Sequence, residues 1–300
     1  MLKDEIIKLK KEKNAVILAH CYQNIEIDEV ADFVGDSLYL SQMAAKTDAD
    51  LIIFAGVYFM AQTAKIISPQ KRVFLPNAKS GCEMADMINL QQVRNFKAAH
   101  KGIPVVCYIN STAEVKSECD ICCTSSNAVE IVKSLNVPEV LFCPDNYLGK
   151  WVEEQLGNIN VITYDGCCPI HRQIVPEDVV NARKIYENAK VLVHPECDKE
   201  VCKLADFVGS TKQIMDYVEQ NDNKTFVIAT EKGVVDRLQR DYPQKEFILI
   251  REDIVCKSMK YNTLEDIYDV LKNETNEIFI DEIISKRALG CINRMLEVCK

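Results

Sequence analysis

Short apolar runs and longer amphipathic segments alternate along most of the chain. The apolar runs are rich in Val, Ile and Phe, which is typical of strands buried on both faces. In the segments between them, apolar residues recur every three or four positions, which indicates helices. The predicted strands are 16–19, 50–56, 72–75, 105–107, 140–143, 161–164, 191–193, 226–229 and 247–250. The predicted helices are 2–13, 28–33, 38–47, 59–67, 90–100, 127–135, 148–156, 176–188, 212–220 and 234–241, and the tail adds a helix at 264–272, a strand at 277–280 and a last helix.

This alternation repeats three times. The string Ala-Asp-Phe-Val-Gly occurs at 31–35 and again at 205–209, which points to duplication. In each repeat the first strand ends at a polar residue, a hydroxyl follows at the same spacing, and a cysteine comes after the third strand. These marks are His20, Ser37 and Cys82, then Tyr108, Ser125 and Cys168, then His194, Thr211 and Cys256.

The repeat predicts an α/β protein of three pseudo-symmetric αβα units, each with a short parallel sheet. We expect the units to span 1–85, 86–171 and 172–256, with residues 257–300 packing on the first unit. Polar groups gather at the carboxyl ends of parallel strands, so three units packed face to face would bring their marked residues to one central site.

Composition and charge narrow the range of partners. The net charge is −9 and no long run of Lys or Arg occurs, which argues against nucleic acid or an anionic membrane as the main partner. No apolar run approaches the roughly 20 residues that span a bilayer, and the N-terminus has no signal-peptide pattern, so we expect a cytoplasmic protein. In that compartment the 14 cysteines indicate metal chemistry, reactive thiols or ordinary buried thiols rather than disulfides.

Three cysteines occupy equivalent places in the three units and predict a metal site. They are Cys82, Cys256 and, in the second unit, Cys168 or its neighbour Cys167, with the spacing favouring Cys168. Structural zinc sites usually have four ligands and close Cys pairs, so zinc is the weaker alternative. Three single cysteines suit a [4Fe–4S] cluster with one iron open to substrate. The string of cysteines at 119–123 has no second pair at zinc-finger spacing, and we interpret it as buried thiols.

Hydroxyl, imidazole and carboxylate groups complete the predicted site. Ser37, Ser125 and Thr211 each precede a helical segment, where a hydroxyl can cap the helix, bind an anion, or do both. At the strand ends, pairs of polar residues two positions apart point to the same side of the chain. Glu196 is the expected general base, with Tyr22 or a histidine as the proton donor. The pairs are His20 with Tyr22, Tyr108 with Asn110, and His194 with Glu196, and His171 lies near Cys168.

These motifs resemble those of quinolinate synthase, the iron–sulfur enzyme of bacterial and archaeal NAD biosynthesis. The resemblance covers the whole length of the chain. It rests on AHCYQ at 19–23, GDS at 35–37, YINS at 108–111, CTSSN at 123–127, GCCPIH at 166–171, HPEC at 194–197, GST at 209–211 and CKSMK at 256–260.

The resemblance implies a triangle of three αβα units around one [4Fe–4S] cluster bound by Cys82, Cys168 and Cys256. It also implies a transferase that condenses iminosuccinate with dihydroxyacetone phosphate and releases phosphate and two waters. The iminosuccinate would come from an aspartate oxidase or dehydrogenase, to which the chain could be functionally coupled.

In this interpretation Glu196, Tyr22 and His194 are catalytic. The substrate-binding residues would be His20, Ser37, Tyr108, Asn110, Ser125, His171, His194, Glu196 and Thr211. The alternatives are another hydro-lyase with the same kind of cluster, or a non-catalytic zinc-binding protein built from three repeats.

Overall fold

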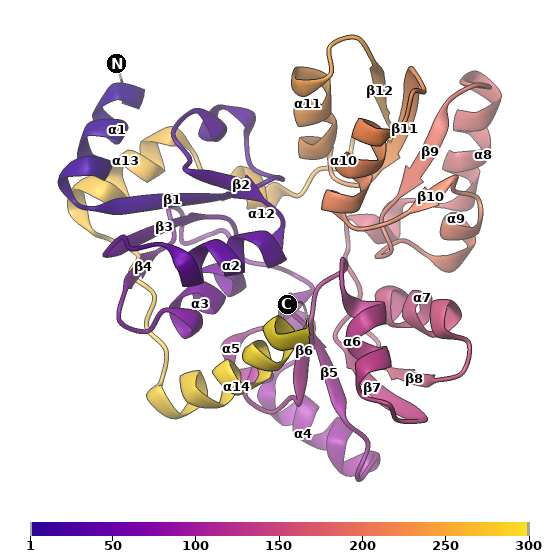
Figure 1. The fold of residues 1–300 in the computed structure, drawn as a ribbon, viewed down its shortest axis with the longest axis horizontal. Helices are drawn as coiled ribbons and strands as arrows, with labels where there is room; N and C mark the ends of the chain where they lie inside the picture. Colours follow the sequence, from indigo (N-terminus) through magenta and orange to yellow (C-terminus); the bar gives the residue numbers. More distant parts are fainter. Residues whose placement is uncertain (1, 299–300) are drawn as a thin grey trace.

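The protein is described here by a computed structural model in which residues 2–298 are placed. Three separate four-stranded sheets are arranged around a common centre (Figure 1). All strand pairs within the sheets are parallel, and the strand that comes second in each unit lies at the edge, beside the first strand. The predicted fold class of three related units with short parallel sheets is therefore confirmed.

The first sheet has the order β2-β1-β3-β4, and its central strands are apolar and buried. Backbone pairing sets Leu18 beside both Phe33 and Phe54. The strands are β1 (Ala15–His20), β2 (Phe33–Gly35), β3 (Leu51–Ala55) and β4 (Arg72–Phe74). The helices are α1 (Leu2–Glu12), η1 (Ile25–Glu29), α2 (Ser37–Lys46), α3 (Tyr58–Ile67) and η2 (Ala85–Met87), where η marks a 3₁₀ helix.

The second sheet, β6-β5-β7-β8, repeats this order. Cys107 on its central strand is paired with Cys122 on one side and Cys143 on the other, so thiols fill part of its core. The strands are β5 (Val105–Tyr108), β6 (Ile121–Cys123), β7 (Glu139–Cys143) and β8 (Asn160–Thr163). The helices are α4 (Leu90–Ala99), α5 (Ala113–Lys116), α6 (Ala128–Ser134), α7 (Asn146–Leu156) and η3 (His171–Gln173).

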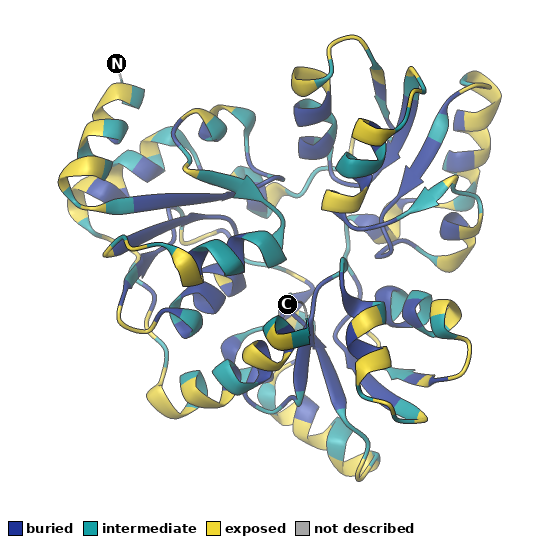
Figure 2. Cartoon of the chain, in the orientation of Figure 1, coloured by how far each residue is buried: buried dark blue, intermediate teal, exposed yellow. Residues whose placement is uncertain are grey.

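The third sheet has the equivalent order β10-β9-β11-β12. Its strands are β9 (Lys190–Val193), β10 (Phe207–Val208), β11 (Thr225–Ala229) and β12 (Glu246–Leu249). Its helices are α8 (Pro176–Ile185), α9 (Lys199–Lys203), α10 (Thr211–Gln220) and α11 (Lys232–Asp241). In all three units the strands are mostly buried and the outer faces of the helices are exposed (Figure 2).

The apolar core is not shared equally among the units. The largest cluster of buried apolar side chains runs from the first unit into the second without a break, for example from Ile52 and Phe59 to Val105 and Phe142. The third unit has two clusters of its own, around Val191 and around Phe226. No helix among residues 2–298 is both long enough and apolar enough to cross a membrane.

The tail divides between two units. It forms α12 (Lys257–Lys260), α13 (Leu264–Asn273) and α14 (Glu282–Val298). Helix α13 packs against α1 and β3 of the first unit, but α14 lies mainly against β6 and α5 of the second, with a further contact to α3. The predicted packing of the whole tail on the first unit is therefore wrong for α14, because the buried Cys291 and Met295 complete the core shared by the two units. The unit boundaries themselves stay a prediction.

Two local predictions are also wrong. The predicted helix at 28–33 is a short 3₁₀ helix that ends at Glu29, and Phe33 begins the edge strand β2. The repeated Phe-Val-Gly string is thus an edge strand in the first and third units, too short to give a periodic signal. The predicted strand at 277–280 is reduced to one antiparallel bridge between Glu277 and Phe74.

Candidate active site

One cavity of about 430 Å³ lies where the three units meet. Much of its wall comes from segments at the carboxyl ends of strands in all three units, as parallel α/β units generally arrange their ligand sites. Every site residue predicted from the sequence lines this cavity. They are His20, Tyr22, Ser37, Cys82, Tyr108, Asn110, Ser125, Cys168, His171, His194, Glu196, Thr211 and Cys256.

Glu196 lies at the centre of a buried polar cluster. Its carboxylate accepts a hydrogen bond from the Tyr108 hydroxyl, and its Oε2 is 2.8 Å from Nδ1 of His171. Burial alone would raise the pKa of Glu196, but His171 and His194 nearby, together with hydrogen bonds from His171 and Tyr108, lower it to about 2. The carboxylate is therefore ionised at neutral pH and accepts protons only.

The ionised carboxylate requires a hydrogen-bond donor at Nδ1 of His171. Since Glu196 cannot donate, the proton between them must reside on Nδ1 of His171. The same Nδ1 is 3.2 Å from the Sγ of Cys168, and Nε2 is 2.8 Å from the hydroxyl of Thr230. The hydroxyl of Thr230 is in turn 3.0 Å from that of Tyr22. A chain of hydrogen bonds thus runs from Glu196 to Tyr22.

His20 and His194 are neutral parts of the wall. Burial, and next the positive charge of Arg237, lowers the pKa of His20 to about 3. Burial is also the main reason that the pKa of His194 falls to about 3. Nδ1 of each ring accepts a backbone N–H two residues ahead, from Tyr22 and Glu196 respectively. Each Nε2–H therefore remains to donate to another group.

The hydroxyls at the helix starts are not helix caps, so the capping interpretation is wrong. Asp36 and Ser210 cap α2 and α10, whereas Ser37 and Thr211 are the first residues inside these helices. The N-cap position of α6 is Asn127, not Ser125. The three hydroxyls are consequently available to the cavity, and Thr211 also bonds the Tyr22 hydroxyl at 2.9 Å. An N-terminal helix position beside a cavity favours anions.

Asn110 supplies a separate sign of a missing partner. Its Oδ1 is buried and has no hydrogen-bond partner among the described residues, although the side chain lines the cavity. Buried carbonyl oxygens are rarely left unsatisfied, because this costs about 1–3 kcal/mol. A ligand with a hydrogen-bond donor would satisfy it.

The three predicted metal-binding cysteines differ from all other described cysteines. Cys82, Cys168 and Cys256 are partly exposed, whereas the others, including Cys167, are buried. Burial is the main cause that raises the pKa of each thiol, to about 12 for Cys82 and about 11 for Cys256. A soft metal would have to displace these protons on binding. The three sulfur atoms do not form one group within 4.8 Å, the spacing that would suit a single ion. The donor set fits a larger group whose metal atoms each bind one thiolate.

The cavity also contains charged residues that the sequence analysis did not assign. Glu231 is fully buried at the start of α11, and burial raises its pKa. Lys257 follows Cys256 and brings a cation to the wall, and Asp36 and Asp253 add carboxylates. Only the position of Lys257 beside a predicted metal ligand could have indicated its place in the site.

Comparisons with known proteins find relatives over nearly the whole length of the chain. Residues 4–297 match the model of the family described as quinolinate synthetase A protein. A quinolinate synthase of Alkaliphilus metalliredigens is 50% identical over 295 residues, which is 98% of this chain and 97% of the relative. A quinolinate synthase of Aquifex aeolicus is 46% identical over 302 residues, which is 99% of this chain and 94% of the relative.

Proposed function

Because the chain belongs to the quinolinate synthetase A family, we propose that it condenses iminosuccinate with dihydroxyacetone phosphate to form quinolinate, phosphate and two molecules of water. The reaction is a transferase step in NAD biosynthesis. It requires a site that holds two carboxylates and a phosphate, moves protons and assists the loss of hydroxyl groups. The residues around the cavity offer each of these capacities.

We propose that Cys82, Cys168 and Cys256 would hold a [4Fe–4S] cluster. The support is that these are the partly exposed cysteines among those described, that they come from three different loops, and that they line one cavity. When bound, such a cluster with an open iron supplies a Lewis acid that polarises a substrate oxygen or nitrogen.

We assign proton transfer to Glu196 as the acceptor and to Tyr22 as the donor. The ionised Glu196 is suited to accept a proton from a carbon beside an imine or carbonyl group. Burial raises the pKa of Tyr22 well above its ordinary value, so this hydroxyl stays protonated and can donate. The hydrogen bonds through His171 and Thr230 allow the proton to be returned from one residue to the other.

Substrate anions have matching partners. The N–H groups of the neutral rings His20 and His194 suit carboxylates, and Asn110 offers an unsatisfied amide oxygen to a substrate hydroxyl or imine N–H. The helix starts at Ser37 and Thr211, with Ser125 and Lys257 nearby in the wall, suit the phosphate. His194 thereby acts as an orienting residue next to Glu196.

We further propose that the reaction takes place in the cytoplasm. All cysteines that the structure describes are free, as expected in a reducing compartment. An aspartate oxidase or dehydrogenase would supply the iminosuccinate, since this unstable imine must be made close to its point of use.

The observation that carries the proposal is the meeting of the three partly exposed cysteines with the Glu196, His171 and Tyr108 cluster in one cavity. The test is anaerobic purification, determination of iron and sulfide, and a quinolinate assay with both substrates. Cys168→Ser should lose the brown colour and the activity, whereas Cys167→Ser should keep both. Zinc in place of iron, or iron without quinolinate formation, would contradict the proposal and favour a zinc-binding protein or another hydro-lyase.

A further inference from the structure

Tyr22 lies in a segment that has no regular structure of its own. We call residues 21–24, between β1 and η1, the Tyr22 loop. The loop belongs to the first unit, but the Tyr22 hydroxyl contacts Thr211 and Thr230 of the third unit, and its ring packs on the core cluster of that unit. The position of Tyr22 therefore depends on how the loop is held against the third unit.

Arg237 of α11 reaches across to the backbone of this loop. Its guanidinium is almost fully buried and donates from Nη1 to the carbonyl oxygens of Cys21 at 2.7 Å and Gln23 at 3.1 Å. These two carbonyls flank Tyr22. From Nη2 it forms an ion pair with Asp28, in the 3₁₀ helix that follows the loop. A single buried side chain thus holds the backbone on both sides of Tyr22 and the 3₁₀ helix that follows the loop.

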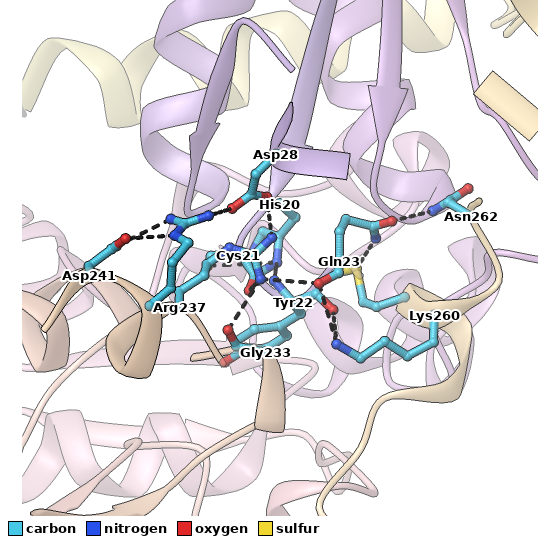
Figure 3. Close-up of polar contacts among 12 residues, drawn as sticks. His20, Cys21, Tyr22, Gln23, Asp28, Gly233, Arg237, Asp241, Lys260 and Asn262 are labelled. Atoms are coloured by element: carbon cyan, nitrogen blue, oxygen red, sulfur yellow. Dashed lines mark hydrogen bonds and ion pairs between the residues drawn. The ribbon is translucent and has the colours of Figure 1, made fainter. Parts of the chain in front are cut away.

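Lys260 binds the backbone carbonyl of Tyr22 itself, from the side opposite Arg237 (Figure 3). Its Nζ donates to the Tyr22 oxygen at 2.7 Å and lies 3.4 Å from Oε1 of Glu231. The same Oε1 accepts the backbone N–H of Cys256 at 3.2 Å. The Tyr22 loop is therefore linked through Lys260 and Glu231 to the backbone of a predicted metal ligand.

Gly233 makes the close approach of α11 to the loop possible. A Cβ at this position would lie 2.8 Å from the Cys21 oxygen and 2.9 Å from the Tyr22 Cα. Both neighbours are backbone atoms of the loop, so they could give way only if the loop moved. The shape of the helix start thus sets the position of the loop as much as its hydrogen bonds do.

We infer that Arg237, Lys260 and Gly233 are positioning residues that hold the Tyr22 loop in its working place against the third unit. The inference deepens the proposed function and rests on Tyr22 being a proton donor. Arg237 has a second effect, since its charge helps to keep His20 neutral. Correct placement matters because a displacement of about 1 Å can lower a rate about a hundredfold.

The primary test compares Arg237→Ala with Arg240→Ala. Arg240 is on the same helix and pairs with the same Asp28, at 2.7 Å, but it is half-exposed, and its hydrogen bonds go to Asp28 and Asp241 rather than to the loop backbone. Arg237→Ala should lower kcat about 10- to 100-fold with smaller changes in KM and with iron content unchanged. Added guanidinium ion at low concentration should restore part of the loss. Arg240→Ala should stay within about twofold of the parent.

Hydrogen exchange provides a readout that does not need activity. The backbone N–H groups of Cys21, Tyr22 and Gln23 are all hydrogen-bonded, so their exchange should be slow in the parent and faster in Arg237→Ala, but not in Arg240→Ala. If quinolinate is not formed by the parent, the proposed function fails, yet the exchange comparison still decides the role of Arg237.

Gly233→Ala serves as a second variant if Arg237→Ala does not fold. This substitution keeps every charge, so a lower kcat together with faster hydrogen exchange at residues 21–24 would support the positioning role. The inference would be overturned if Gly233→Ala had the same kcat and the same hydrogen-exchange rates as the parent. It would also be overturned if Arg237→Ala and Arg240→Ala lost kcat equally.

Discussion

Tyr22 and Glu196 are joined by an unbroken chain of hydrogen bonds. The chain passes from the Tyr22 hydroxyl to Thr230 at 3.0 Å, from Thr230 to His171 at 2.8 Å, and from His171 to Glu196 at 2.8 Å. The two ends come from different units. Thr230 is fully buried and was not among the residues predicted from the sequence.

Replacing Thr230 tests this connection. Thr230→Val keeps the shape but removes the hydroxyl, and we expect kcat to fall about tenfold or more, because a hydrogen-bonded link in proton transfer is lost. Thr230→Ser keeps the hydroxyl and should retain most of the activity. The measurement is the steady-state kcat of the two variants, compared at equal iron content. Equal rates in both would contradict a role for the hydroxyl.

Glu196→Gln should lower kcat more than Thr230→Val does. The amide cannot accept a proton as a carboxylate does, so we expect kcat to fall about 10²- to 10⁴-fold while the iron content and visible absorbance remain. Glu200→Gln, on the exposed face of α9, is the control and should retain activity. Loss of iron in Glu196→Gln would instead indicate that the carboxylate supports the metal site.

The buried neutral histidines make stability depend on pH. His20 and His194 each have a pKa of about 3 when folded, against 6.5 when unfolded. As pH falls from 6.5 toward 3, the unfolded chain binds protons that the folded chain does not, so the free energy of unfolding decreases. The limiting slope is about 1.4 kcal/mol per pH unit for each histidine. Urea unfolding at pH 7 and at pH 5.5 would measure this change in the free energy of unfolding.

The variant that tests this dependence removes one of the two histidines. His194→Asn should have a free energy of unfolding that depends less steeply on pH than that of the parent, because one buried neutral imidazole is lost. An unchanged slope in His194→Asn would show that the loss of stability at low pH originates elsewhere.

Substitutions of two adjacent residues at the start of α10 should have different effects, one on stability and the other on activity. Ser210 accepts the backbone N–H of Gln213 as a helix cap, so Ser210→Ala should lower the free energy of unfolding by about 1 kcal/mol and change kcat/KM little. Thr211→Val removes the hydroxyl that faces the cavity and bonds Tyr22, so kcat/KM should fall about tenfold. Denaturant unfolding and steady-state assays would show the opposite pattern if Ser210 were the substrate contact.

The sequence contains enough information to predict the three units and the residues at their strand ends. His20, Tyr108 and His194 end equivalent buried strands, and equivalent strand ends must meet if the units pack around a common centre. The edge strands β2 and β10 were missed because their two or three residues are too few to establish a period.

The residues that support the site could not be predicted in this way. Arg237 lies in a predicted amphipathic helix and Lys260 in the CKSMK string, and neither was assigned a role. Their partners in the Tyr22 loop lie more than two hundred positions away in the chain. Thr230 and Glu231 follow β11, a strand whose end was not among the polar marks of the repeat. Their roles arise from contacts between units, which local sequence patterns do not predict.

The division of the apolar core gives the molecule two bodies rather than three. The first and second units share one continuous cluster, so drawing them apart would expose apolar surface to water at a high cost. The third unit keeps its own clusters and meets the others through few apolar side chains, such as Tyr22 and Trp151, and through ion pairs such as Arg237 with Asp28. Water can replace polar contacts far more cheaply than apolar ones. The third unit is therefore the part of the cavity wall that can be displaced with least loss of free energy, and Cys256 and Glu196, the proposed metal ligand and general base, would move with it.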